Sequence, residues 1–519
     1  MTRALYAAAF AALFALSFPV RAGDVHFDLG LVAGWVALIP FALMLRGLSP
    51  VRAFAWAWGS GGVALCAVIP WLYVVVHVHG HAPAAIAVLA VVGLSLYVGL
   101  HVGIAGWLTA LAEPAAGRLG LLALPAAWVV SEHLRTFSAS NGFPWAFLGY
   151  SVHRNGPLLE LASLAGVYGL TFLLALFAAL AVRRRVVAAA VLVVVAHVAG
   201  FGLRLAAEPE PVAGLRWAGL VQANIPQGEK WDPAKAQGAF DAHVELSRLV
   251  AASGEVDLIV WPEASAPVFL QMQEDYQSTL LELARETDAV LLVGGVGIEP
   301  IDGGRDFSYS NSLFQISPDG EVVDRYDKSV LVPFGEFVPY RSVLGFLSGV
   351  ATGIASGDLT PGPGAGTLAV GPSLLAPLIC YEVLYPSAVR EAVLRGPRVL
   401  VNVTNDAWYG RSSAPHQFVA MAAMRSAEHG LPMLRAANTG VSAVVDSGGV
   451  ILRDSPIFER TALRVPLPGA RRGPTLYTLL GDWIVWLSWG LLLATGGRRV
   501  VGRSWRSGAG HAGADSRPE

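Results

Sequence analysis

The sequence is poor in charged residues, in cysteine and in lysine. Charged residues make up 14% of the 519 residues, compared with about 25% in an ordinary soluble domain. The two cysteines, Cys66 and Cys380, lie far apart, which excludes a disulfide framework and a cysteine-based metal cluster. The net charge of −2 gives no indication of nucleic-acid binding. Because 54% of the residues are hydrophobic, the composition favours a membrane protein.

The apolar residues gather in eight segments that are almost free of charge. Most segments approach or exceed the ~20 residues that a helix needs to cross a bilayer. Seven segments precede Leu215 and one follows Thr475, which predicts about eight transmembrane helices. The segments are residues 5–20, 27–45, 54–78, 82–111, 119–130, 158–182, 186–203 and 476–493.

Arginines are unevenly divided between the loops that join these segments. With the N-terminus in the cytoplasm, the outside loops carry only Arg21, Arg135 and Arg154, and the inside loops and the C-terminal tail carry the larger share. This distribution fits the positive-inside rule and places residues 215–473 outside the cytoplasm. The first segment has an alternative interpretation as a cleaved signal peptide, although we favour a retained helix.

Changes in composition divide the chain into four predicted parts. Residues 1–210 form a seven-helix transmembrane region, and residues 211–472 form an extracytoplasmic α/β domain large enough for its own core. Residues 473–496 form a C-terminal transmembrane helix, and residues 497–519 form a basic cytoplasmic tail that we expect to be disordered.

Strand and helix patterns alternate in the α/β domain, and hairpins that turn at residues 317–320 and 446–449 interrupt them, which predicts a mixed sheet with helices on its outer faces. The predicted strands are residues 216–225, 256–261, 289–298, 311–316, 321–326, 374–380, 398–403 and 433–438. The predicted helices are residues 234–252, 278–287, 386–394 and 415–429.

Three ionisable side chains follow buried strands of this domain: Glu263, Lys328 and Cys380. Functional groups collect at the ends of strands in open α/β sheets, so we expect these three to lie close together. A thiol can attack a carbonyl, a carboxylate raised in pKa by burial can take the thiol proton, and an ammonium can favour the thiolate and stabilise an oxyanion. The start of a helix after Cys380 would also favour the thiolate. The alternatives are a buried, inert cysteine and a structural ion pair between Glu263 and Lys328.

Longer motifs surround these residues and carry a resemblance. WPEAS at residues 261–265, YDKSVLVPFGEFVP at 326–339 and ICYEVLYP at 379–386 resemble the nitrilase (carbon–nitrogen hydrolase) superfamily. The segment VQANIPQGEKWD at 221–232, the segment NDAWYG at 405–410 and the eight-span layout resemble its membrane-bound branch, the apolipoprotein N-acyltransferases. The resemblance covers nearly the whole chain and implies that the outer domain is an αββα sandwich.

The resemblance also implies roles for individual residues. Cys380 is implied as the nucleophile, Glu263 as the general base, Lys328 as the cation that stabilises the oxyanion, and Glu336 as a supporting glutamate. No cofactor and no metal are implied.

Four further residues match supporting positions of the family. Tyr381 and Glu382 match the pair that follows the cysteine. Trp231 and Trp408 match aromatic residues near the substrate entrance, and ordinary packing is the alternative interpretation for both.

The implied reaction moves a fatty acyl chain from a membrane phospholipid, phosphatidylethanolamine in the family, to Cys380 as a thioester. The α-amino group of the diacylglyceryl-cysteine of an apolipoprotein then takes the acyl chain. The implied enzyme is a monomer in the inner membrane of a bacterium, with its catalytic domain in the periplasm. Two alternatives remain: a membrane-tethered amidase or nitrilase for a small carbon–nitrogen substrate, and a transporter or membrane scaffold.

Overall fold

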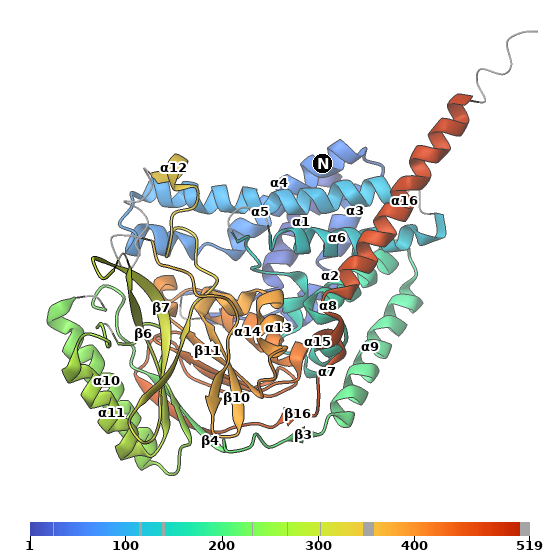
Figure 1. Ribbon diagram of the computed structural model, residues 1–519. Helices are drawn as coiled ribbons and strands as arrows, with labels where there is room; N and C mark the ends of the chain where they lie inside the picture. Colours follow the sequence, from blue (N-terminus) through green and yellow to red (C-terminus); the bar gives the residue numbers. More distant parts are fainter. Residues whose placement is uncertain are drawn as a thin grey trace, which may run out of the picture.

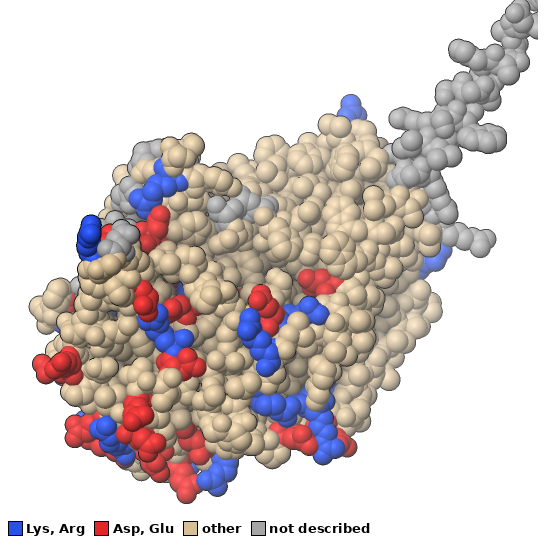
Figure 2. Space-filling model, in the orientation of Figure 1, with Lys and Arg blue, Asp and Glu red and all other residues tan. Residues whose placement is uncertain are grey.

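The structure is a computed structural model that describes residues 1–23, 25–113, 117–137, 141–230, 232–266, 268–301, 303–345 and 358–508. An apolar helical bundle packs against an α/β domain (Figure 1). On the face shown in Figure 2, charged side chains gather over the α/β domain, whereas the bundle is almost bare of them. This arrangement confirms the predicted combination of an apolar helical region with an α/β domain.

Within the described residues, four helices are long and apolar enough to cross a membrane. They are α4 (Pro50–Val68), α5 (Ala84–Ala112), α8 (Ala162–Val182) and α9 (Val186–Ala206). Shorter apolar helices occupy the other predicted segments: α1 (Thr2–Leu16), α2 (Gly30–Val36), α3 (Leu38–Leu45), α6 (Ala123–Leu134) and the first part of α16 (Trp483–Gly508). The count of eight spans therefore stays a prediction, as does the orientation.

Several of the predicted spans are interrupted, the second and the third among them. The second divides into α2 and α3 at Ala37. The third ends as α4 at Val68, two residues before Pro70, whose ring and missing N–H disfavour a continuous helix. The remaining elements of the bundle region are short: β1 (Val20–Ala22), β2 (Val25–Phe27), η1 (Val74–His79), η2 (Gly117–Leu122), η3 (Leu148–Val152), α7 (Gly156–Glu160) and α15 (Leu476–Leu480).

The α/β domain contains two six-stranded mixed sheets. The first has the order β15-β4-β5-β6-β7-β8 and the second has the order β14-β13-β12-β11-β10-β9. The strands of the first sheet are β4 (Trp217–Gln222), β5 (Leu258–Val260), β6 (Val290–Ile301), β7 (Asp306–Ile316), β8 (Val322–Asp327) and β15 (Thr461–Pro466). Those of the second are β9 (Leu368–Val370), β10 (Ser373–Ile379), β11 (Val399–Thr404), β12 (Met433–Ala437), β13 (Ala443–Val445) and β14 (Ile451–Asp454).

Helices cover the outer face of each sheet. Helices α10 (Pro233–Ala252) and α11 (Glu274–Thr287) pack on the first sheet, and α13 (Pro386–Val393) and α14 (Ala414–His429) pack on the second. The result is a four-layer arrangement of helices, sheet, sheet and helices (Figure 1). The predicted strands and helices of this domain are present with shifted ends, whereas β9 and β15 were not predicted.

Alternation along the strands explains the layers. In β5, Leu258 and Val260 point into the core between the sheets, and Ile259 points into the core beneath α10 and α11. In β6, Leu292 likewise points into the core between the sheets, and Leu291 points into the core beneath α10 and α11. Successive side chains of a strand point to opposite faces, so a strand that is apolar throughout is covered on both sides.

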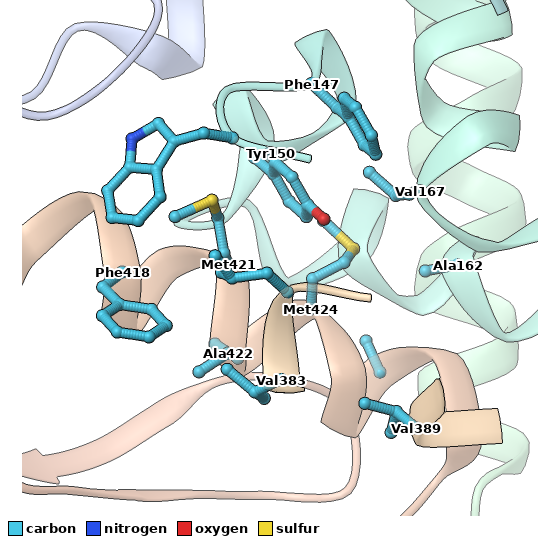
Figure 3. Close-up of a cluster of buried hydrophobic side chains, with 14 of the residues drawn as sticks. Phe147, Tyr150, Ala162, Val167, Val383, Val389, Phe418, Met421, Ala422 and Met424 are labelled. Carbon is cyan, nitrogen blue, oxygen red and sulfur yellow. The ribbon is translucent and has the colours of Figure 1, made fainter. Parts of the chain in front are cut away.

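Helix α14 joins the α/β domain to the bundle. Figure 3 shows Phe418, Met421 and Met424 of α14 packed toward Phe147 and Tyr150 of the bundle region. Every residue of α14 except His416 is buried. One face of this helix therefore packs on the second sheet, and the other packs on the membrane region.

Gln417 is a buried polar residue in the interface between α14 and the bundle. Its Oε1 accepts hydrogen bonds from the indole N–H groups of Trp71 (3.3 Å) and Trp145 (2.7 Å). Its Nε2 donates to the main-chain carbonyls of Pro19 (3.0 Å) and Val68 (3.1 Å). All four hydrogen-bonding positions of the amide are satisfied, so this buried polar group fixes α14 against several segments of the bundle.

The chain enters and leaves the α/β domain at neighbouring points. Strand β3 (Pro209–Glu210) pairs with β16 (Ala470–Arg471) in a short antiparallel ribbon. The predicted domain boundaries at residues 210 and 472 lie at this ribbon.

Candidate active site

Strand ends of both sheets supply the three predicted residues. Glu263 follows β5, Lys328 follows β8, and Cys380 follows β10, so two residues come from the first sheet and one from the second. The carboxylate of Glu263 and the ammonium of Lys328 both act electrostatically on the Cys380 thiol. The fold thus brings together three groups that span 117 positions of the sequence, from 263 to 380.

Glu263 is buried and fully hydrogen-bonded. Its Oε1 accepts hydrogen bonds from Nδ2 of Asn311 (2.8 Å) and Nζ of Lys328 (3.2 Å). Its Oε2 accepts a hydrogen bond from the main-chain N–H of Asn405 (2.8 Å). The carboxylate is therefore held from both sheets, because Asn311 lies in β7 and Asn405 follows β11.

Lys328 lies between two carboxylates. Its Nζ is 3.2 Å from Oε1 of Glu263 and 2.9 Å from Oε1 of Glu336. Asn311 bridges the same two carboxylates, since its Nδ2 lies 2.8 Å from each. The predicted supporting residue Glu336 therefore contacts Lys328 and shares Asn311 with Glu263.

Cys380 occupies a strained turn at the end of β10. Its φ is +51°, in the left-handed region that residues with a Cβ seldom adopt. The turn opens the short helix η5 (Cys380–Leu384), which directs the chain away from the sheet. A sulfur on such a turn projects from a rigid strand end, as a nucleophile must.

The charge states differ from the sequence-based expectation. Burial raises the pKa of the Cys380 thiol, the charge of Glu263 raises it further, and the charge of Lys328 and a hydrogen bond with Thr404 offset only part of this. The expectation that Lys328 favours the thiolate therefore has the right direction, but its charge does not outweigh burial, so the thiol stays neutral in the resting site. Desolvation dominates, and η5 is a single short turn of 3-10 helix.

The expectation for Glu263 was wrong in direction. Burial would raise the pKa of its carboxyl, but the charges of Lys328 and Lys230 and the hydrogen bonds from Asn311 and Lys328 outweigh burial and lower it. Burial alone would lower the pKa of the Lys328 ammonium, but its two carboxylates raise it well above the ordinary value. The resting site thus holds an ionised acid, a charged amine and a neutral thiol.

Glu382 ties the cysteine turn to the lysine loop. Its Oε1 accepts hydrogen bonds from the Tyr326 hydroxyl (2.9 Å), from the N–H (2.7 Å) and hydroxyl (2.8 Å) of Ser329, and from the N–H of Val330 (3.2 Å). Its Oε2 accepts from the N–H of Ile379 (2.7 Å). Glu382 therefore links Ile379, the neighbour of Cys380, to Ser329 and Val330, which follow Lys328.

Replacement of Glu382 by glutamine is expected to lower stability by about 1–3 kcal/mol, because an amide cannot accept from donors on both sides without leaving one unpaired. Thermal unfolding of the purified protein in detergent measures the change. Glu391→Gln is the matched control, since Glu391 lies on the exposed face of α13 and its carboxylate only approaches Arg395 at 3.8 Å. Equal melting temperatures for both variants would contradict this structural role.

The remaining predicted residues divide into three cases. The Tyr381 hydroxyl donates to the main-chain carbonyl of Gly142 (3.3 Å), which joins the cysteine turn to the membrane region. Trp408 is half-buried, and its ring meets that of His79 edge-on at a centroid distance of 5.7 Å. Trp231 lies outside the described residues. Both tryptophans keep their two interpretations, substrate entrance or packing.

Sequence reasoning missed four residues that touch the site. Asn311, Asn405 and Lys230 bond to Glu263, and Thr404 bonds to Cys380. Asn405 and Lys230 lie within the motifs NDAWYG and VQANIPQGEKWD, so their position in a motif was the available signal. Asn311 carried none, because it lies within an ordinary strand.

No group of three or more His, Cys, Asp or Glu side chains within the described residues could hold a metal ion. The two histidines at the ends of α14 make other contacts. His416 stacks on His26 with ring centroids 4.1 Å apart, and His429 is hydrogen-bonded to the Thr478 hydroxyl (2.9 Å).

Comparison with known proteins gives two family matches. Residues 217–472 match the carbon-nitrogen hydrolase family, and residues 10–180 match the apolipoprotein N-acyltransferase N-terminal domain. The chain is 36% identical to the apolipoprotein N-acyltransferase of Geobacter metallireducens, over 87% of this chain and 88% of that one. It is 32% identical to the protein of the same name from Shewanella oneidensis, over 89% of this chain and 91% of that one.

Among solved structures, an amidase of the nitrilase superfamily from Nesterenkonia aligns with 54% of this chain and 98% of its own, at 19% identity and a TM-score of 0.39.

Proposed function

This chain belongs to the apolipoprotein N-acyltransferase family and N-acylates lipoproteins, and we propose that it does so through a thioester of Cys380 in a two-step reaction. The observation that carries the proposal is the contact between Glu263, Lys328 and Glu336 beside the strained Cys380 turn.

In the first step, Glu263 accepts the proton of the Cys380 thiol as the sulfur attacks an ester carbonyl of a phospholipid. The ammonium of Lys328 stabilises the oxyanion that develops on that carbonyl. As the oxyanion collapses, the ester C–O bond breaks and Glu263 returns its proton to the departing lysophospholipid oxygen. The products are a lysophospholipid and an acyl thioester on Cys380.

In the second step, the neutral α-amino group of a lipoprotein's diacylglyceryl-cysteine attacks the thioester. Glu263 accepts a proton from the nitrogen and returns it to the sulfur as the C–S bond breaks. An amide forms and the thiol is restored. A thioester suits this sequence, because it resists loss during product exchange yet remains reactive toward an amine.

The resting charge states define when the proton moves. An ionised Glu263 beside a neutral thiol cannot hold a stable thiolate, since both the low pKa of the acid and the high pKa of the thiol oppose the transfer. The proton therefore moves as the carbon–sulfur bond forms. The sulfur therefore stays protonated until an electrophilic carbon lies within its reach.

The membrane region follows from the lipid nature of both substrates. Each buried CH₂ adds about 0.8 kcal/mol to membrane retention, so neither a phospholipid nor a diacylglyceryl protein leaves the bilayer readily. An enzyme that joins them must present its thiol at the bilayer surface. The proposed donor is phosphatidylethanolamine, and the proposed setting is a monomer in the bacterial inner membrane with the α/β domain in the periplasm.

A labelled phospholipid tests the proposal. Incubation of the purified enzyme with phosphatidylethanolamine that carries an isotopically labelled sn-1 chain is expected to add one acyl group to the peptide that contains Cys380, with no acceptor present. Addition of a diacylglyceryl peptide should then move the label to the peptide's α-amino group.

Mass spectrometry measures both transfers, and a Cys66→Ser variant is the control because it leaves Cys380 as the single thiol. An acylated product that forms only when donor and acceptor are present together, with no labelled Cys380, would overturn the thioester route. Turnover of a small amide without acyl transfer would favour the membrane-tethered amidase instead.

A further inference from the structure

Lys230 is a second buried lysine at the active site. It lies in the loop between β4 and α10, and only 2% of its surface is exposed. Its Nζ donates a hydrogen bond to the main-chain carbonyl of Glu263 (2.8 Å). Within the described ranges it forms no ion pair with a carboxylate, although a buried ammonium is costly without one.

The charge balance of the site explains why an ammonium is buried here. Glu263 and Glu336 are two carboxylates that share the single cation Lys328. These three groups carry a net charge of −1 when all are ionised, and Lys230 brings the sum to zero. Its charge lowers the pKa of the Glu263 carboxyl, and the charges of Glu263 and Cys380 act on Lys230 in return. Burial lowers the pKa of Lys230 to about 8.

The hydrogen bond of Lys230 also acts on the backbone of the base. Glu263 precedes Ala264, whose φ of +47° places it in the left-handed region. Gly294 of β6 packs so tightly against this turn that an added Cβ would lie 2.2 Å from the carbonyl oxygen of Pro262. Lys230 binds the turn at the adjacent carbonyl, so a strained backbone is fixed by packing on one side and by an ammonium on the other.

The loop that carries Lys230 is itself anchored to the site. Gln227 Oε1 accepts a hydrogen bond from Nδ2 of Asn405 (2.8 Å), and the N–H of Asn405 donates to Glu263. The main chain of Ile225 exchanges hydrogen bonds with the side chain of Asn438 (2.8 and 2.9 Å). These contacts hold Lys230 at a fixed place beside the base.

We propose that Lys230 is a positioning residue for the two-step reaction: its buried ammonium fixes the main chain of Glu263 and supplies the second positive charge that keeps this base ionised beside a neutral Cys380. The inference rests on the proposed function. Lys230 transfers no proton to the reacting groups, and it forms and breaks no covalent bond. Its charge matters most as the sulfur becomes negative and the proton passes to Glu263.

The pH dependence of acylation reports this role. Glu263 must be ionised to accept the thiol proton, so the rate falls as the pH drops through the pKa of its carboxyl. Loss of the Lys230 charge raises that pKa and moves this acid limb to higher pH. The groups that face Glu263 or Lys230 from the surrounding elements are Lys328, Glu336, Cys380, Asp406, Tyr409 and His243.

Three substitutions separate the charge from the hydrogen bond. Lys230→Gln keeps a donor and removes the charge, Lys230→Arg keeps both, and Lys230→Met removes both. Lys235→Met is the matched control, because Lys235 is a half-exposed lysine of the same segment that pairs with Glu229 (2.8 Å). All variants carry Cys66→Ser and are measured as full-length protein in detergent.

The measurement is the single-turnover rate at which labelled phosphatidylethanolamine acylates Cys380 across the pH range. We expect Lys230→Gln to move the acid limb up by about one pH unit, as removal of a nearby opposite charge does, so that the rate on the limb falls about tenfold. The rate of Lys230→Met should fall further than that of Lys230→Gln. The acid limbs of Lys230→Arg and Lys235→Met should stay at the wild-type position.

Two outcomes overturn the inference. A Lys230→Gln profile that coincides with the wild type excludes the charge role, and a Lys230→Met rate equal to that of Lys235→Met excludes both roles. If Lys230→Met does not fold, the position of the acid limb in Lys230→Gln relative to Lys230→Arg tests the charge role.

Alkylation of Cys380 by iodoacetamide, followed across pH without lipid, separates the two proposals. If the wild type forms no acyl-enzyme but its alkylation still depends on Lys230 as described, the proposed reaction fails and the positioning role stands.

Discussion

Replacement of Cys380 by alanine is expected to abolish acyl transfer. A reaction that proceeds through a covalent intermediate loses about 10⁴-fold or more when its nucleophile is removed, as other catalytic triads do. The fold should survive, because the thiol is a small side chain and alanine adds no volume to the turn. Lipoprotein N-acylation by the purified variant measures the loss, and the melting temperature checks the fold.

A serine variant refines this result. Cys380→Ser keeps the shape of the side chain, but the hydroxyl is far less acidic than a thiol and Glu263 is a weak base. Proton transfer should therefore fail, and no acyl adduct should accumulate at residue 380. Cys66→Ser, which changes a cysteine in α4 of the bundle, should retain full activity. Undiminished transfer by Cys380→Ala would end the assignment of the nucleophile.

Replacement of Lys328 by methionine should damage both activity and stability. Loss of the group that stabilises the oxyanion lowers turnover by about 10²–10³-fold. The change also leaves Glu263 and Glu336 facing one another without their shared cation. Breaking a buried ion pair from one side typically costs about 3–5 kcal/mol of stability.

The stability loss should depend on pH in a stated direction. Without Lys328, burial raises the pKa of the Glu263 carboxyl above the unfolded value, so the folded state binds a proton more tightly than the unfolded state. Such groups contribute stability at low pH and lose it as the pH rises through the folded pKa. The variant should therefore melt at a higher temperature as the pH is lowered.

A double variant separates the two effects. Lys328→Met with Glu336→Gln removes one of the unpaired carboxylates and should recover part of the melting temperature, yet activity should stay low. Melting curves and acylation rates for the single variant, the double variant and Lys235→Met provide the comparison. Recovery of activity together with stability would show that Lys328 acts only as a structural ion pair.

The convergence of Glu263, Lys328 and Cys380 could be predicted from the sequence because each of them follows a strand. Val256 to Trp261 reads as a short apolar strand, and Glu263 comes two residues later. The same holds for the run that ends at Cys380. These signals are local, and the rule that functional groups collect at strand ends is sufficient to bring them together.

Contacts between side chains of separate elements could not be predicted in this way. Asn311 lies in the alternating pattern of β7, and nothing in its neighbours distinguishes it from a surface amide. Its role depends on Glu263 and Glu336, which reach it from other elements. The pKa directions of Glu263 and Cys380 could not be predicted either, since they depend on how deeply each group is buried and on the charges that other elements place around it.

The covering of α14 was also beyond sequence reasoning. Residues 415–429 read correctly as a helix, but Arg425 and Glu428 suggest a face in water. Both are fully buried, joined to each other at 3.1 Å, and Glu428 accepts the main-chain N–H of Val167 (2.8 Å) from α8. A charged pair on a helix therefore does not by itself indicate a solvent-exposed face, because another part of the chain can cover it.

The shared burial of α14 sets an order for biosynthesis. The N-terminal helices of the bundle are made first, because they precede the α/β domain in the chain. They leave Trp71, Trp145 and the carbonyls of Pro19 and Val68 without the partner that satisfies them. That partner, Gln417, emerges only near the end of translation. The N-terminal helices therefore provide the surface on which α14, an outer helix of the α/β domain, packs. An α/β domain expressed without the bundle would expose the apolar face of α14 to water, and the amide of Gln417 would lose its four hydrogen-bond partners.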